Sequence, residues 1–204
     1  MRLTARFRRA FSGSMSSSDG LALLAVDVQP TFFRAMTAPE AFLGRCRLAV
    51  SAARLLSLPV LFTEQVPAKL GPTHPDLLLD AGASVERFPK SSFSAFGAEG
   101  LADRLAGASV EHLLVLGLEG PVCVHQTALE ALRLGLGVTV LADAVTSRRA
   151  ADQDVCFAAL RAAGVAVLPV ETVFYSALRG ADHPAFREFT DLVKRFGQVR
   201  STGS

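Results

Sequence analysis

The chain has 204 residues, of which half are hydrophobic and one fifth are charged, and its formal net charge is +2. This length and composition allow one sizeable core, so we expect one folded domain. The near-neutral charge balance gives no support to a nucleic-acid partner, and no apolar run approaches the roughly 18 residues of a membrane span. Three widely spaced cysteines argue against a disulfide framework and indicate a reducing compartment.

Residues 1–19 differ from the rest of the chain because they are basic, rich in serine and without an acidic residue before Asp19. Leu3, Phe7 and Phe11 also share one helical face. Such segments are typical of organelle transit peptides, and a disordered basic tail is the alternative. We therefore expect a leader over 1–19 that directs the protein to mitochondria, with a cytoplasmic location otherwise. The folded domain is expected over 20–198, followed by a flexible tail over 199–204.

The first expected element is a buried strand over 21–28, an apolar run (LALLAVDV) that ends in polar residues. Residues 39–57 have apolar side chains at helical spacing, and Pro39 suits a first helical turn. A second strand is expected over 59–65. Residues 66–97 are rich in Pro, Gly and Ser and are expected to be irregular, and a loop of that length is usually functional.

The second half of the chain continues the alternation of strands and helices. It predicts, in order, a helix over 98–107, a strand over 111–119, a helix over 121–134, a strand over 137–145, a helix over 148–163, a strand over 164–171 and helices over 172–179 and 184–196. This alternation indicates an α/β domain whose parallel sheet is covered on both faces. Ligands bind such sheets outside the carboxyl ends of the strands. The polar residues at expected strand ends are Asp27, Gln29, Thr63, Glu64, Glu119 to Cys123, and Asp143.

Cys123 is the most reactive of the three cysteines by its expected position. It lies in GLEGPVCVHQTALEAL, where Gly120 as N-cap would place Pro121 at the first helical position. Free N–H groups and the helix dipole would then favour a thiolate at Cys123, and could hold an oxyanion. Burial as a small hydrophobe is the alternative, and we assign it to Cys46 and Cys156.

Asp27 and Lys90 are the candidate partners of this thiol. A buried Asp27 needs a donor or a charged partner, although capping of a loop or helix is the alternative to catalysis. Lys90, in RFPKSSFSAFG, could be the cation that keeps Asp27 and Cys123 in useful protonation states. Its ammonium could also simply extend to solvent from beside the aromatic residues.

Taken together, VDVQ, PKSSFSAFG and GLEGPVCVHQTAL resemble, in order and spacing, the motifs of the isochorismatase-like cysteine hydrolases. The subgroup with poorly defined substrates is the most similar, over residues 21 to about 196. The resemblance implies a three-layer α/β/α, Rossmann-like fold with a six-stranded parallel sheet, and a homo-oligomer. It implies a catalytic triad of Asp27, Lys90 and Cys123. It also implies a non-proline cis peptide between Glu119 and Gly120, and an oxyanion hole formed by the N–H groups of Gly120 and Cys123.

The sequence departs from the family pattern at three places. Gly120 replaces a frequent Thr or Ala, which should not harm a turn. Pro121 replaces a frequent polar residue, so a polar contact to substrate could be lost. His74 lacks the further metal ligands of the family's nicotinamidases, so we expect no zinc or other cofactor and disfavour nicotinamidase. Retention of Cys123 favours attack on an acyl carbon over vinyl ether hydrolysis.

These features predict a cysteine hydrolase that cleaves a small amide-type C–N substrate through a thioester. A redox-responsive thiol protein and a substrate-binding module on the same fold are the alternatives. The expected partners are a small-molecule substrate and further copies of the chain, with no nucleic acid and no membrane. Four aromatic residues near the motifs are expected to form the pocket walls, and they suggest a small, partly apolar or planar substrate: Phe32, Phe33, Phe93 and Phe96.

Overall fold

The computed structural model describes residues 20–36, 38–83 and 85–197, so the expected leader and tail lie outside the described residues. Within them, six parallel strands form one sheet in the order β3-β2-β1-β4-β5-β6. The strands are β1 (Leu21–Val26), β2 (Val60–Gln65), β3 (Glu86–Lys90), β4 (His112–Gly117), β5 (Gly137–Val145) and β6 (Ala166–Leu168). The expected three-layer α/β/α, Rossmann-like fold is confirmed.

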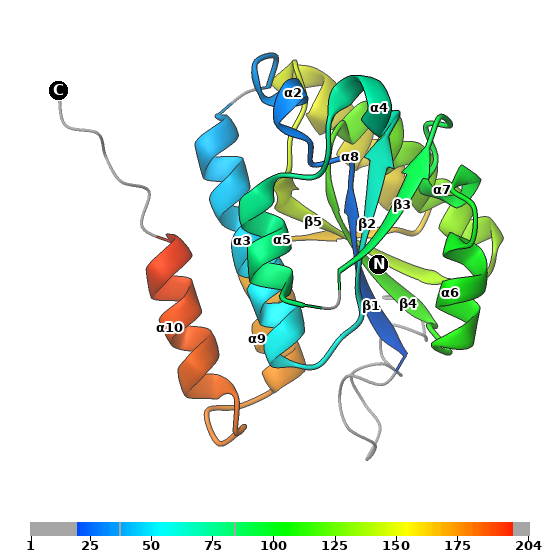
Figure 1. Ribbon diagram of the computed structural model, residues 1–204. Helices are drawn as coiled ribbons and strands as arrows, with labels where there is room; N and C mark the ends of the chain where they lie inside the picture. The colour runs from blue at the N-terminus through cyan, green and yellow to red at the C-terminus, as the bar shows by residue number, and fades with distance from the viewer. Residues whose placement is uncertain (1–19, 37, 84, 198–204) are drawn as a thin grey trace, which may run out of the picture.

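Helices cover both faces of the sheet (Figure 1). One face carries α3 (Pro39–Leu55), α5 (Pro75–Ala81), α9 (Val170–Leu178) and α10 (Phe186–Gly197). The other carries α6 (Leu101–Gly107), α7 (His125–Arg133) and α8 (Ala150–Ala162). The short helices α2 (Pro30–Phe33) and α4 (Pro67–Leu70) lie at the carboxyl end of the sheet. In the described chain no helix is long and apolar enough to cross a bilayer.

The central strands explain the continuous apolar runs in the sequence. β1 and β4 are buried along their whole lengths, because each has a neighbouring strand on both sides and helices on both faces. Alternate residues of β1 enter two separate cores, with Leu23 packed beneath α3 and Leu24 facing α6 and α7. The core therefore holds the carboxyl end of β1 rigidly at the middle of the sheet.

Residues 66–97 are not irregular, and this expectation was wrong. They contain α4, α5, β3 and a short 3₁₀ turn, η1 (Ala95–Gly97). The sequence analysis did not predict β3 because this strand has no continuous apolar run. It is an edge strand that pairs with β2 alone and includes Pro89. An edge strand tolerates proline, since one row of its backbone N–H groups has no ladder partner.

The chain winds away from β1 in both directions, which places a switch point between β1 and β4. Gly117, the last residue of β4, has φ +129°, and a Cβ there would lie 2.0 Å from the carbonyl oxygen of Val26. Only glycine permits this approach of the two backbones. The close approach brings the carboxyl end of β1 next to the turn that follows β4.

Candidate active site

Asp27 follows directly after β1 and has a left-handed backbone, with φ 53°. Aspartate tolerates this conformation better than most residues. Its side chain is buried and is surrounded by donors. Thr63 Oγ1 donates to Oδ1 at 2.8 Å, and Lys90 Nζ donates to Oδ2 at 2.6 Å. The carboxylate is therefore fixed at the central strand end and faces a cation.

Lys90, the last residue of β3, has a completely buried side chain. In the described structure four oxygen atoms surround its Nζ. Besides Asp27 Oδ2, they are Gln65 Oε1 at 2.6 Å and the carbonyl oxygens of Ser92 at 3.1 Å and Phe93 at 3.3 Å. These acceptors leave Lys90 suited to charge balance at Asp27 and poorly suited to accept a proton itself.

Cys123 completes the cluster from the far side of the switch point. It lies in η2 (Gly120–Val124), a wide helical turn that leads into α7. Its thiol is hydrogen-bonded to the Asp27 carboxylate, and the backbone N–H of Glu119 donates to its Sγ. Residues from three different strand ends, Asp27, Lys90 and Cys123, are thus brought together as expected.

Burial of the thiol opposes the thiolate that the first helical turn was expected to favour. Burial raises the pKa of Cys123 to about 12; the charge of Asp27 adds to this effect, and Lys90 opposes it. Burial also raises the pKa of Asp27, against the opposing effect of Lys90 and its hydrogen bonds. A base must therefore remove the Cys123 proton during attack, and Asp27 is the base in contact with it.

The cis peptide lies between Leu118 and Glu119, so its expected place between Glu119 and Gly120 was wrong by one bond. Gly120 is the first residue of η2, Pro121 is the second, and Glu119 precedes them. The Gly120 N–H donates to the Thr146 carbonyl at 3.0 Å, because the end of β5 lies beside this turn. It is therefore engaged and does not serve an oxyanion hole as expected. The Glu119 N–H, which faces the thiol, replaces it as the candidate donor.

The four aromatic residues expected to form pocket walls are divided between the two sides of the sheet, and their role as pocket walls stays a prediction. Phe32 and Phe33 pack against the core beneath α3, and Phe33 stacks on His74. Phe96 packs against the opposite core, which includes Cys123, and Phe93 is 54% exposed. In the described residues, no aromatic contact joins any two of the four.

Several polar residues at strand ends hold the structure together. His74 caps α5, where its Nδ1 accepts from the Asp76 N–H at 3.2 Å. Glu64 Oε1 accepts from the backbone and hydroxyl of Thr73. Asp143 pairs with Arg45 at 2.7 Å. The part of the chain that the structure describes contains no cluster of side chains that could hold a metal ion.

Two glutamines support the site: Gln65, which the sequence analysis did not name, and Gln29, which it named only as a polar residue at a strand end. Gln65 Oε1 contacts Lys90, and its Nε2 donates to the Ser91 carbonyl at 3.0 Å, which fixes the amide orientation. Gln29 is fully buried and exchanges hydrogen bonds with the Gln65 backbone. In the sequence, both glutamines are polar residues at the end of an apolar run. Glu64 fits the same description, but its hydrogen bonds go to Thr73 and not to the triad.

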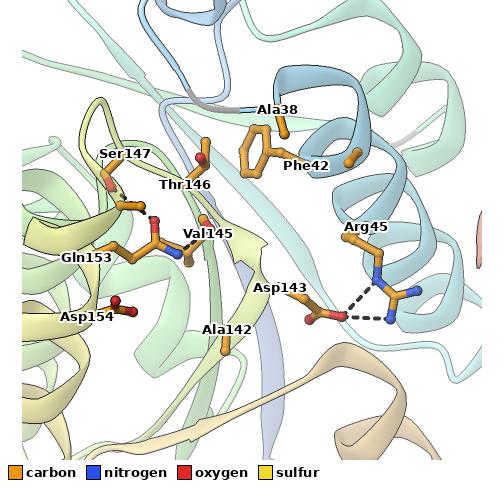
Figure 2. A pocket seen from close by; sticks show the side chains of 12 residues that line it. Ala38, Phe42, Arg45, Ala142, Asp143, Val145, Thr146, Ser147, Gln153 and Asp154 are labelled. Atoms are coloured by element: carbon orange, nitrogen blue, oxygen red, sulfur yellow. Dashed lines mark hydrogen bonds and ion pairs between the residues drawn. The ribbon is translucent and has the colours of Figure 1, made fainter. Parts of the chain in front are cut away.

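A pocket of about 390 Å³ lies between α3, the end of β5 and the start of α8 (Figure 2). None of the triad residues lines it. Its ion pair, between Arg45 and Asp143, is satisfied internally, and Gln153 bonds to the end of β5 (Figure 2). The pocket is therefore separate from the triad.

The parallel α/β sheet with Asp27, Lys90 and Cys123 together at its switch point fits what the resemblance to the isochorismatase-like hydrolases implies. The isochorismatase domain profile matches residues 21–172, and the chain belongs to this family. Isochorismatase domain-containing protein 2A of Mus musculus is 36% identical over 146 residues, covering 71% of this chain and 68% of that protein.

Solved structures show the same fold. The MAR1 ribonuclease from Caenorhabditis elegans superposes with a TM-score of 0.84 at 30% identity, covering 92% of this chain and 96% of the other. YcaC from Pseudomonas aeruginosa, in a structure with hexane-2,5-diol and covalent acrylamide, gives a TM-score of 0.76 at 22% identity, covering 89% and 96%. The fold is therefore a hydrolase fold.

Proposed function

We propose that the protein is a cysteine amidohydrolase that cleaves a C–N bond in a small amide-type substrate. The observation that carries this proposal is the Asp27 carboxylate, which bonds at once to Lys90 Nζ and to the Cys123 thiol in a buried site. A buried acid next to a nucleophile and a fixed cation is the arrangement that general-base activation of a thiol requires.

The reaction begins when Asp27 takes the thiol proton as Cys123 Sγ attacks the carbonyl carbon. The carbonyl π electrons move to oxygen, and the N–H groups of Glu119 and Cys123 stabilise the oxyanion. When the C–N bond breaks, Asp27 gives its proton to the leaving amine, and a thioester remains. Asp27 then deprotonates a water that attacks the thioester, which releases the carboxylic acid and restores the thiol. Lys90 keeps the charge at Asp27 balanced throughout.

A small carbonyl substrate is supported by the burial of the site. Cys123 is 8% exposed and Asp27 1% exposed, so only a compact group can reach the thiol. The covalent acrylamide in the YcaC structure makes small amides the first probes to use. The description of the Caenorhabditis elegans protein as a ribonuclease makes RNA the necessary comparison substrate. Buried reactive groups argue against a bulky polymer.

The test is a screen of small amides, nitriles and an RNA oligonucleotide, with mass detection of an adduct on Cys123. The proposal predicts release of ammonia or amine and a thioester mass on the Cys123 peptide. Cys123→Ala should fold normally and lose turnover by more than ~10³-fold, whereas Cys46→Ala and Cys156→Ala retain it. RNA cleavage without amide turnover would contradict the proposal. Stoichiometric oxidation of Cys123 without turnover would favour the redox alternative.

We also propose a homo-oligomer, a small-molecule substrate and no nucleic-acid or membrane partner. The oligomer is supported by the YcaC product of Escherichia coli, which is described as an octameric hydrolase. The mitochondrial destination of residues 1–19 remains a prediction. Fusion of this segment to a fluorescent protein tests it, and diffuse cytoplasmic fluorescence would contradict it.

A further inference from the structure

Glu119 is not one of the triad residues, but its backbone forms a hydrogen bond to the Cys123 sulfur. Its N–H donates to Cys123 Sγ, and its carbonyl accepts from the N–H groups of Val122 and Val124. The direction of that N–H depends on how the Glu119 peptide is held. The contacts of the Glu119 side chain therefore bear on the thiol.

The Glu119 side chain is held by one residue of the β5–α8 connection (residues 146–149). Glu119 Oε1 accepts from Arg148 Nε at 2.9 Å and from the Arg148 backbone N–H at 3.3 Å. The Glu119 side chain is 17% exposed, so the bond is partly shielded, whereas the Arg148 side chain is 63% exposed. Arg148 thus reaches the catalytic turn from the solvent side.

The next peptide unit is held by the same part of the chain. The Gly120 N–H donates to the Thr146 carbonyl at 3.0 Å, and the Cys156 thiol donates to the Gly120 carbonyl at 3.3 Å. A Cβ at Gly120 would lie 3.2 Å from Val145 Cγ1, so the contact is close. The turn between β4 and η2 is therefore fastened along its length to the end of β5 and the start of α8.

Hydrogen bonds hold the β5–α8 connection in place, and Figure 2 shows those that join Ser147 to Gln153 and Gln153 to Val145. The single proton of the Ser147 hydroxyl is shared between the Arg149 carbonyl oxygen, 2.9 Å from Oγ, and Gln153 Oε1, 3.1 Å from Oγ. Gln153 Nε2 donates to the Val145 carbonyl at 3.1 Å. A guanidinium anchored on such a segment can fix the side chain that it binds.

We propose that Arg148 is a positioning residue that orients the Glu119 peptide toward the Cys123 thiol. The inference rests on the proposed function, because it assigns a role at the same sulfur. The charged groups that face the thiol itself are Asp27 and Lys90, and neither contacts Arg148. An ion pair as exposed as that of Arg148 contributes little to folding, so removal of the Arg148 side chain should leave the fold intact.

The experiment compares Arg148→Ala and Arg148→Lys with Arg149→Ala. Arg149 is a matched control, since it is also exposed and pairs with Asp152 at 3.4 Å. The readout is the rate at which iodoacetamide alkylates Cys123 in the folded protein between pH 6 and pH 10. Mass spectrometry of the peptide that contains Cys123 measures how much has reacted at each time. Arg148→Ala should slow alkylation about 5-fold across this range, because Glu119 loses its bond from Arg148 Nε and its N–H is then directed less well at the thiolate. Arg148→Lys should recover part of the rate, and Arg149→Ala should match the wild type.

Salt provides a second arm. About 0.5 M KCl screens exposed ion pairs, so it should slow the wild type toward the Arg148→Ala rate and leave that variant unchanged. The proposal would be overturned if Arg148→Ala and Arg149→Ala were alkylated at equal rates. It would also be overturned if salt slowed alkylation of the wild type and of Arg148→Ala by the same factor. Alkylation of Cys123 does not require a substrate to be turned over. If the substrate screen fails but Arg148→Ala is still alkylated more slowly than Arg149→Ala, only the proposed function is contradicted. A wild-type Cys123 that reacts no faster than Cys46 contradicts both.

Discussion

Asp27 and Cys123 have pKa values shifted in the same direction, and this matters for proton transfer between them. Burial raises both, and Lys90 acts against both shifts. A carboxylate with a raised pKa is a stronger base, so transfer of the thiol proton to Asp27 is less unfavourable than the thiol pKa alone would imply. Solvent exclusion therefore prepares the base as well as protecting the nucleophile.

The buried pair of Lys90 and Asp27 predicts a strongly unequal effect of single and double substitution. Lys90→Met leaves the Asp27 carboxylate buried without its cation, which should lower the free energy of unfolding by about 3 kcal/mol or more at neutral pH. The double variant Asp27→Asn, Lys90→Met removes both charges and should recover most of this loss. Urea unfolding of the three proteins measures the difference.

The sign of the pH dependence follows from the same residue. Without Lys90, the folded-state pKa of Asp27 rises further above 3.8, the ordinary value. Folded Asp27 then holds its proton where the unfolded chain has lost it, so stability falls as pH rises through that interval. The deficit of Lys90→Met relative to the double variant should be larger at pH 7 than at pH 4. A deficit that is constant with pH would show that packing, not charge, causes it.

At the scale of elements, the β1–β4 junction sets where the triad meets. The Leu118 N–H donates to the Val26 carbonyl at 2.8 Å, and Gly117 lies against the same peptide. Asp27 follows Val26 directly, and the turn that carries Cys123 follows Gly117. A shift of either strand would separate the carboxylate from the thiol.

Gly117→Ala should therefore damage both fold and site. The added Cβ would lie 2.0 Å from the Val26 carbonyl oxygen, at a φ of +129° that disfavours alanine. We expect a loss of about 3 kcal/mol or more in the free energy of unfolding. Gly107→Ala, at the end of α6 with no atom within 4 Å, is the control and should be neutral or stabilising. Similar thermal midpoints for the two variants would contradict this account.

At the scale of the whole molecule, all three thiols are buried, and this gives the fold an alkaline limit. Burial raises the pKa of Cys123 to about 12 and of Cys156 to about 11, and it raises the pKa of Cys46 well above its ordinary value. Unfolded thiols ionise near the ordinary value of 9.0, so the unfolded state loses protons first. The free energy of unfolding therefore keeps its full value below pH 9.0 and falls as pH rises above it.

Above pH 9, each such thiol should lower the free energy of unfolding by up to about 1.4 kcal/mol per pH unit. Denaturant unfolding between pH 8 and 11 measures the slope. Cys123→Ala removes one of the three thiols. The decrease in the free energy of unfolding with pH should therefore be less steep, by up to about 1.4 kcal/mol per pH unit. An unchanged slope in that variant would indicate that Cys123 ionises alike in both states.

The proposed association is also a property of the whole molecule. Sedimentation at micromolar concentration should give a mass that is a multiple of the 21.6 kDa chain. Apolar residues exposed on the described surface, such as Val155 at 73% and Leu79 at 75%, are candidates for burial between copies. A monomer at that concentration would contradict the proposal.

Most of the fold could be predicted from the sequence because a doubly covered parallel sheet leaves a strong pattern. Buried strands such as 21–26 and 112–117 are continuous apolar runs, and the helices between them have apolar positions at helical spacing. β3 lacked this pattern, since an edge strand alternates in burial and tolerates Pro89. The region from 66 to 97 was therefore misjudged as a loop.

By itself the sequence determined which chemical groups are present, namely an acid, a lysine and a cysteine in family motifs at the ends of predicted elements. Only the tertiary structure decided their states and partners. The pKa of Cys123 depends on burial against Asp27, and the use of the Gly120 N–H depends on Thr146, 26 residues further along the chain. Desolvation and hydrogen bonding between distant segments act over a few ångströms in space, so no local pattern along the chain records them.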